Sequence, residues 1–310
     1  MFDPTRLEFS LDMRELNRCS TLVHGIANSG KTYLLGDFLK YESQFGKVAF
    51  IDVLGEGGAL SLADLGLSAA GHKGYRVSTR KELMDLLDWL STQELRALAF
   101  DSLKAFVRLV IAERVGSDRM PEVKRNSEEN EWGDIHFRME RTVGGRLNAA
   151  APWIMAACLS DKSIEQISGK TYVTPDLPGR EAAGCISWFD LAGYIKAEKT
   201  VSVERTFMVT PNNTILTRQR LPRPITEDIK LPVGPGGWAT IRSRIDEAMA
   251  PLPGVATPQE SSNVGQRDAS AGVPGGPVET ASSTSPSPAP SRIIVPKMQV
   301  VREKVTGRRI

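Results

Sequence analysis

Residues 19–32 read Cys-Ser-Thr-Leu-Val-His-Gly-Ile-Ala-Asn-Ser-Gly-Lys-Thr, and this stretch decides the fold. Its first six residues predict a short buried strand. A glycine-rich loop follows, and the residues from 31 to 41 predict a helix that places Leu34, Leu35, Phe38 and Leu39 on one face. A loop between a buried strand and an amphipathic helix is typical of an α/β domain that binds phosphate at the start of the helix.

The loop matches the pattern Gly-x-x-x-x-Gly-Lys-Thr, which predicts a nucleotide triphosphate site. Glycines let the backbone approach phosphate oxygens closely, and the loop N–H groups then point at the phosphates. The lysine would pair with the β- and γ-phosphates, and the threonine hydroxyl would hold Mg²⁺. The predicted ATP-binding residues are Gly25, Ile26, Ala27, Asn28, Ser29, Gly30, Lys31 and Thr32.

A second motif lies downstream, where residues 96–100 form an apolar strand that ends at Asp101. A carboxylate at the carboxyl end of a strand beside the loop is well placed to reach Mg²⁺, so Thr32 and Asp101 are the predicted metal ligands. The alternative is that Asp101 caps the helix expected from residue 103 to about 114.

Hydrolysis also needs an acid that orients the attacking water. Glu56 follows the strand at residues 47–53 and is flanked by glycines, so it is the preferred candidate, against the alternative of a surface turn acid. Asp52 is the second candidate. Together with Lys31 and Asp101, Glu56 forms the predicted catalytic set.

Further strands are expected at residues 74–78, 152–159, 185–197, 205–210 and 215–218, and further helices at 79–91, 132–148 and 238–249. Strands that alternate with helices predict a mostly parallel sheet covered on both faces. Residues 116–131 and 160–184 are expected to be loops. Lys162, Lys170 and Arg180 in the second loop are candidates for contacts with a DNA backbone, against the alternative of an ordinary solvated loop.

Composition narrows the class of protein. The chain of 310 residues has a net charge of +2, which excludes a strongly basic nucleic-acid coat. Three cysteines without paired spacing argue against a disulfide framework or a zinc site. No apolar run is long enough for a membrane span, and the N-terminus lacks the pattern of a signal peptide, so a cytoplasmic protein is expected.

The chain divides into four segments by composition. Residues 1–17 are expected to be an N-terminal arm, and residues 18–250 the α/β domain. Residues 251–291 are rich in Pro, Ser and Gly and predict a disordered linker. Residues 292–310 alternate apolar and basic side chains, which favours a tethered peptide that binds DNA or a protein partner, or else a solvated tail.

The chain resembles the RecA-like P-loop ATPases. The resemblance rests on residues 48–52 followed by 56–58, and on Phe100-Asp101-Ser102. Residues 131–133, the strand 153–159, the loop 175–180 and residues 188–193 are similar to phage-encoded members that include Sak-type single-strand annealing proteins. The resemblance as a whole covers roughly residues 18–222.

The resemblance implies a RecA-like core, with Mg-ATP at the loop and Glu56 as the water-activating residue, although residues 54 and 55 place Glu56 further from its strand than in RecA. It implies a polar sensor at Ser160, a DNA-contacting segment at 160–184, and a ring or filament of subunits. Arg218 and Arg220 would then complete the ATP site of a neighbouring subunit.

Two functions follow from these observations. The first is a phage recombination ATPase that binds single-stranded DNA and promotes annealing or strand exchange. The alternative is an ATP-controlled assembly or partner-recruiting protein in phage replication or packaging, without significant turnover; a single-strand-binding or replication protein would bind residues 292–310. A small-molecule kinase is a weaker option, and the lack of an Asn-Lys-x-Asp motif disfavours a GTPase.

Overall fold

A computed structural model of the protein describes residues 17–55, 72–116, 131–164, 171–178, 181–199 and 203–250. The chain divides into two units at residue 250, and the described residues all belong to the first. The expected arm (except residue 17), linker and C-terminal peptide lie outside the described residues, as do Glu56, Lys170 and Arg180.

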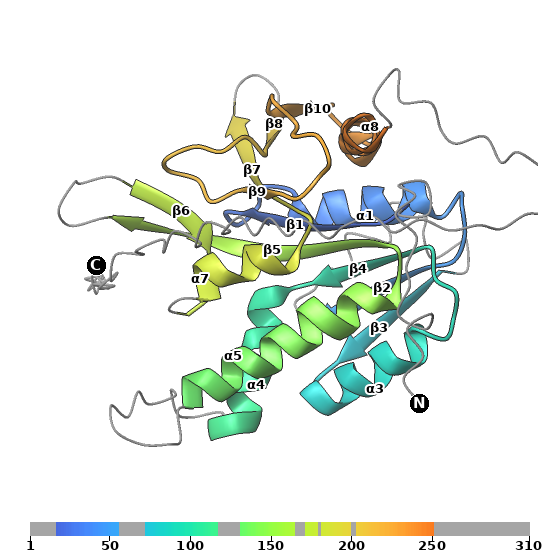
Figure 1. The fold of residues 1–310 in the computed structure, drawn as a ribbon, viewed down its shortest axis with the longest axis vertical. Coiled ribbons are helices and arrows are strands. Elements are labelled where there is room, and N and C mark those ends of the chain that lie inside the picture. Colours follow the sequence, from blue (N-terminus) through green and yellow to red (C-terminus); the bar gives the residue numbers. More distant parts are fainter. Residues whose placement is uncertain are drawn as a thin grey trace, which may run out of the picture. The chain divides into compact units, whose positions relative to one another are not determined.

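The first unit is built on a central sheet with the strand order β10-β8-β7-β1-β5-β4-β2-β3 (Figure 1). Six neighbouring strands, from β7 to β3, run parallel, while β8 and β10 are antiparallel to their neighbours. The described strands are β1 Cys19–Gly25, β2 Val48–Val53, β3 Lys73–Val77, β4 Ala97–Asp101, β5 Trp153–Ile164, β6 Thr171–Pro175, β7 Leu191–Lys199, β8 Val203–Met208, β9 Arg218–Gln219 and β10 Ile229–Leu231.

The central strands are buried on both faces, as a parallel sheet requires. The register pairs Gly25 of β1 with Leu159 of β5, and Asp101 of β4 with Ala157 of β5. Asp52 of β2 lies opposite Asp101. The carboxyl ends of β1, β4 and β2 therefore meet at one edge of the sheet, where the sequence predicts the nucleotide.

Helices cover both faces of this sheet, which confirms the predicted fold class (Figure 1). Helices α1 and α8 pack on one face through a core that includes Phe38 and Trp238, and α3, α4 and α5 cover the other. The helices are α1 Lys31–Glu42, α3 Arg80–Leu90, α4 Leu103–Val115, α5 Glu131–Glu140, α6 Asn148–Ala150, α7 Glu181–Gly184 and α8 Gly237–Met249, with a π-helix η2 Arg141–Leu147 and a 3₁₀ turn η3 Cys185–Trp188.

The predicted strands at 19–24, 47–53, 96–100 and 152–159 are confirmed as β1, β2, β4 and β5. The expected loop at 160–184 is wrong in part, because β5 continues to Ile164 and pairs antiparallel with β6 to form a two-stranded ribbon. The ribbon's described side chains are mostly exposed or half-buried, so its residues lack the apolar alternation that signals a strand.

Three other expectations need correction. Residues 185–188 form the turn η3, and the strand begins only at Leu191, because a short apolar run fits a buried turn as well as a strand. The single helix expected at 132–148 is divided by the π-helix η2. The strand expected at 215–218 is reduced to β9, and β10 follows it, so Arg218 and Arg220 do not come after the last strand.

A buried ion network anchors the far end of α1. The fully buried carboxylate of Glu42 accepts hydrogen bonds from Arg96 Nε at 2.9 Å, Arg242 Nη1 at 2.8 Å and Trp238 Nε1 at 3.0 Å. The Arg242 guanidinium also lies 3.5 Å from the centroid of the Trp153 ring. A buried charge is tolerable only with such complete pairing, so this network fixes α8 against α1 and the sheet.

The three cysteines are unpaired and buried, which agrees with the expected absence of a disulfide. Burial raises the pKa of both Cys19 and Cys158 to about 12, so neither thiol forms a nucleophilic thiolate near neutral pH. Within the described ranges, no helix has both the length and the apolar character needed to cross a membrane.

Candidate nucleotide site

The loop between β1 and α1 has a backbone that only certain residues can adopt. Gly30 immediately precedes α1 with φ of 96°, and Asn28 also has a positive φ of 61°. The positive φ favours glycine at position 30, and a Cβ atom there would also lie 2.6 Å from Arg205 Nε, so the arginine side chain would have to move. The first N–H groups of any α-helix point toward its amino end, which for α1 is the loop. Because Gly30 has no side chain to cap α1, these groups can bind a ligand in the loop.

Lys31, the first residue of α1, extends back over the loop. Its ammonium group donates hydrogen bonds to the carbonyl of Gly25 at 2.9 Å and to that of Ile26 at 2.7 Å. Burial lowers the pKa of Lys31, and the nearby charge of Asp101 opposes that shift. These two neutral carbonyls hold the half-buried ammonium group of Lys31. A phosphate oxygen would be a stronger partner for it, because that hydrogen bond would join two charged groups.

Thr32 and Asp101 meet at the carboxyl edge of the sheet. The Thr32 hydroxyl donates to Asp101 Oδ2 at 3.0 Å, which brings the first turn of α1 to the end of β4. Asp101 is 8% exposed. The next residue, Ser102, caps α4 by accepting a hydrogen bond from the Ala105 N–H at 3.3 Å. The capping role that was the alternative for Asp101 therefore belongs to Ser102.

This pair fits Mg²⁺ bound together with a triphosphate. A hydroxyl and a carboxylate are hard oxygen ligands, and Mg²⁺ in such sites completes its octahedron with water and phosphate oxygens. In the described part of the chain, no cluster of three or more His, Cys, Asp or Glu residues is arranged to hold a metal by itself. Thr32 and Asp101 would thus hold the ion only with a nucleotide beside it.

Of the two candidates for the water-activating acid, the structure describes only Asp52. Glu56 lies outside the described residues. Asp52 is the penultimate residue of β2 and lies opposite Asp101; it is 3% exposed and accepts a hydrogen bond from Arg76 Nη2 at 3.4 Å. Asp52 thus lies at the same edge of the sheet as Asp101, where it forms an ion pair with Arg76.

Ser160 lies on β5, the strand between the loop strand β1 and the Asp101 strand β4, where a sensor is expected. Ser160 forms a hydrogen bond with His24, the residue before Gly25, and His24 Nδ1 lies 2.9 Å from Ser160 Oγ. The other ring nitrogen, His24 Nε2, lies 2.8 Å from the carbonyl oxygen of Leu216. The carbonyl can only accept, so we infer that Nε2 carries the proton and that the serine hydroxyl donates to Nδ1. Burial lowers the pKa of His24 to about 4, which keeps this ring neutral.

Arg205 is a residue at the site that the sequence did not indicate. It lies on β8, packs against Gly30, and donates from Nε to the carbonyl of Ser29 at 3.2 Å. Among the residues that the structure describes, it forms no ion pair with a carboxylate. Because 176 positions separate Arg205 from Ser29, no spacing in the sequence could have revealed the contact.

The remaining predicted residues lie apart from the loop. Arg218 pairs with Ala192 of β7, and the Arg220 N–H donates to the carbonyl of Asp190 at 2.7 Å, so both lie toward the amino end of β7. Burial and the neighbouring Arg220 charge lower the pKa of Arg218. Lys162 is exposed on the ribbon of β5 and β6. The structure therefore does not bring the two arginines to the chain's own nucleotide loop.

The fold, the loop with Lys31 and the Thr32–Asp101 pair define a P-loop NTPase of the α/β class. Residues 17–221 match the family model described as an AAA domain. The chain belongs to this AAA domain family, whose members are generally nucleotide-binding ATPases. No curated protein matches the chain.

Proposed function

We infer that this protein is a magnesium-dependent ATPase of phage DNA recombination, which binds single-stranded DNA and promotes annealing or strand exchange in the host cytoplasm. The observation that carries the ATPase is the convergence of Lys31, Thr32 and Asp101 at the carboxyl edge of the sheet. The phage and recombination assignments rest on the resemblance of residues 131–133, 153–159, 175–180 and 188–193 to phage-encoded annealing proteins.

The residues of the site have distinct roles in this proposal. The loop N–H groups and the start of α1 bind the phosphates, and Lys31 exchanges its two carbonyl partners for the β- and γ-phosphates. Thr32 and Asp101 hold Mg²⁺, which neutralises charge on the phosphates when bound. Glu56 orients the attacking water, with Asp52 as the second candidate.

The ribbon of β5 and β6 is the proposed contact with single-stranded DNA. Lys162 is exposed on it, and Lys170 and Arg180 belong to the same segment of the chain. The base of the ribbon is joined to the loop strand by the hydrogen bond between Ser160 and His24. A change at Gly25 on nucleotide binding would reach this hydrogen bond directly, because His24 and Gly25 are adjacent.

The proposal includes a ring or filament of identical subunits. Arg218 and Arg220 lie toward the amino ends of the parallel strands, while the chain's own loop lies at the carboxyl ends. That position favours an action on the nucleotide of a neighbouring subunit rather than on their own. The segment 292–310 would recruit a single-strand-binding or replication protein.

The test is ATP turnover of the purified protein with and without single-stranded DNA, with Lys162→Ala and the control Lys230→Ala, an exposed lysine on β10. We expect DNA to stimulate turnover of the wild type and of Lys230→Ala, and to stimulate Lys162→Ala less. Turnover without any DNA affinity or DNA effect would contradict the recombination role. ATP binding without turnover would instead favour the ATP-controlled assembly protein.

A further inference from the structure

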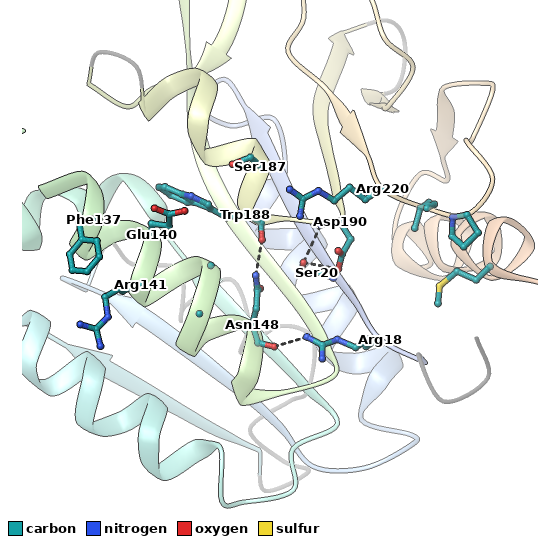
Figure 2. Close-up of a pocket in the computed structure, with 15 residues that line it drawn as sticks. Arg18, Ser20, Phe137, Glu140, Arg141, Asn148, Ser187, Trp188, Asp190 and Arg220 are labelled. Carbon is teal, nitrogen blue, oxygen red and sulfur yellow. Dashed lines mark hydrogen bonds between the residues drawn. The ribbon is translucent and has the colours of Figure 1, made fainter. Parts of the chain in front are cut away.

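A cavity of about 890 Å³ lies at the amino ends of β1 and β7 (Figure 2). Ser20 at the start of β1 lines it, whereas the nucleotide loop begins at the other end of that strand, about 17 Å away along five residues. The volume is within the range of roughly 300–1,000 Å³ found for ligand sites. The cavity is therefore separate from the P-loop and large enough for a small organic ligand.

Three arginines line this cavity, Arg18, Arg141 and Arg220. Figure 2 shows Arg220 extending toward Trp188, while Arg141 lies on the opposite side beside Phe137. Among residues with described positions, none of the three arginines forms an ion pair with a carboxylate. Arg18 donates to the Asn148 carbonyl at 3.1 Å, and Arg141 lies 5.5 Å from the centroid of the Phe137 ring.

Two carboxylates also line the cavity, and both have partners. Asp190 Oδ2 accepts hydrogen bonds from the Ser20 N–H and hydroxyl, each at 2.9 Å. Glu140 Oε2 lies 3.9 Å from His136 Nε2. The lining carries three arginines against these two carboxylates, a formal net charge of +1, which favours an anionic ligand such as a phosphate.

An exposed aromatic ring and exposed backbone complete the lining. Phe137 is 55% exposed, whereas Trp188 on η3 is only 7% exposed and belongs to the core. Between them runs the π-helix η2, a geometry that often marks functional sites. Its Gly145 lines the cavity, and a Cβ atom there would meet no atom within 4 Å, so the backbone at this point faces open space.

From this combination we propose that the cavity binds a nucleotide unit, with the phosphate on an arginine of the lining and the base against the exposed ring of Phe137. Planar bases stack on aromatic rings and arginine planes, and phosphates pair with guanidinium groups, so this chemistry recognises both parts of the ligand. The unit can come from single-stranded nucleic acid or from a free nucleotide. This site goes beyond the proposed function, which places DNA on the ribbon of β5 and β6.

The experiment uses the full chain and two probes, a fluorescent thymidine oligonucleotide of about 15 nucleotides and thymidine monophosphate. Gly145→Trp fills the cavity from a position where the added side chain meets no protein atom at its Cβ. Phe137→Ala with Arg141→Ala removes one stacking face and one charge without filling space. Arg220 stays intact in every variant, because it is also proposed to act on a neighbouring ATP site.

Arg146→Ala is the matched control. Arg146 lies on the same π-helix and carries the same charge, but it pairs with Asp88 at 2.7 Å and does not line the cavity. Melting curves of each variant verify that it is folded. We expect Gly145→Trp and the double variant each to lose about tenfold or more in affinity, while Arg146→Ala stays within about twofold of the wild type.

The two probes identify the source of the ligand. Loss of oligonucleotide affinity in both cavity variants assigns the site to single-stranded nucleic acid. Loss of affinity for the monophosphate alone assigns it to a free nucleotide. Unchanged affinity for both probes, or an equal loss in Arg146→Ala, overturns the proposal. ATP turnover is measured separately, so a failed cavity proposal is distinguishable from a failed ATPase.

Discussion

The two ends of helix α1 carry opposite charges, and these charges differ in burial and in their hydrogen-bond partners. Glu42, its last residue, is fully buried and bonded to two guanidinium groups and an indole N–H. Lys31, its first residue, is half-buried and donates to the carbonyls of Gly25 and Ile26. Both charges are held in place, but only Glu42 has its charge balanced by directly bonded partners.

This difference indicates which charge supports the fold and which serves a ligand. A buried carboxylate with three donors has little capacity left for another partner, so it stabilises the native state. An ammonium group bonded to two neutral carbonyls gains more from a phosphate than from its present partners. Among the described residues, Lys31 has no hydrogen-bonded carboxylate, and it lies beside the glycine-rich loop. We therefore take the Lys31 end as the binding end of α1 and the Glu42 end as its structural end.

Replacing Glu42 with Gln tests the structural end and has the largest expected effect on stability. The substitution leaves Arg96 and Arg242 without their shared counter-charge in the interior. We expect the free energy of unfolding to fall by about 3–5 kcal/mol, measured by chemical denaturation. Asp85→Asn, which breaks an exposed pair with Lys81, is the control and should change stability by less than about 0.5 kcal/mol. Equal effects of the two substitutions would contradict the comparison.

Replacing Lys31 with Ala tests the binding end. We expect ATP turnover to fall by about a hundredfold or more, because a charge aimed at the transferred phosphate is lost. Stability should change little, since only two bonds to carbonyls of the loop disappear. Lys40→Ala, an exposed lysine near the other end of α1, should retain turnover. A large loss of stability without loss of turnover would reverse the roles assigned to the two ends.

The neutral ring of His24 gives the binding end a pH dependence of stability. Its pKa is about 4 because of burial, against an unperturbed value of about 6.5, so the unfolded state binds more protons between these two values. Stability contributed by the neutral ring is complete above about pH 6.5 and is lost as the pH falls toward 4. Between pH 7 and pH 5 we expect wild type to lose about 2 kcal/mol more than His24→Gln, measured by denaturation at each pH. Parallel pH profiles would disprove this.

Arg205→Ala should have the smallest effect. The substitution removes one hydrogen bond to the Ser29 carbonyl and one positive charge beside the loop. We expect ATP affinity to weaken by about fivefold, measured by calorimetry. Arg244→Ala, an exposed arginine on α8, serves as the control. An affinity equal to that of the control would show that Arg205 only packs against Gly30.

The sequence allowed the binding end to be predicted because its information is local. Gly25, Gly30, Lys31 and Thr32 lie in one continuous stretch, and Asp101 ends an apolar strand that is recognisable without the rest of the fold. Parallel pairing then brings both motifs to the same edge of the sheet. The buried strands β1, β2, β4 and β5 were predictable along the chain for the same reason.

The structural end and the cavity could not be predicted, because they depend on contacts between distant segments. Glu42 and Arg242 are 200 positions apart, and neither has a local pattern that indicates burial. The π-helix at Arg141–Leu147 divides what reads as one helix, since its periodicity differs only slightly from that of an α-helix. The ribbon of β5 and β6 escaped prediction because most of its described side chains are not buried.

The measurement that tests the nucleotide site most directly is calorimetric binding of ATP with and without Mg²⁺, for wild type and Asp101→Asn. The amide oxygen introduced by this substitution would still accept a hydrogen bond from Thr32 but would lack the charge that holds the ion. We predict that Mg²⁺ strengthens ATP binding to the wild type about tenfold or more, and that this gain is largely lost in Asp101→Asn. An equal gain in both proteins, or no ATP binding by the wild type, would contradict a Mg-ATP site formed by Lys31, Thr32 and Asp101.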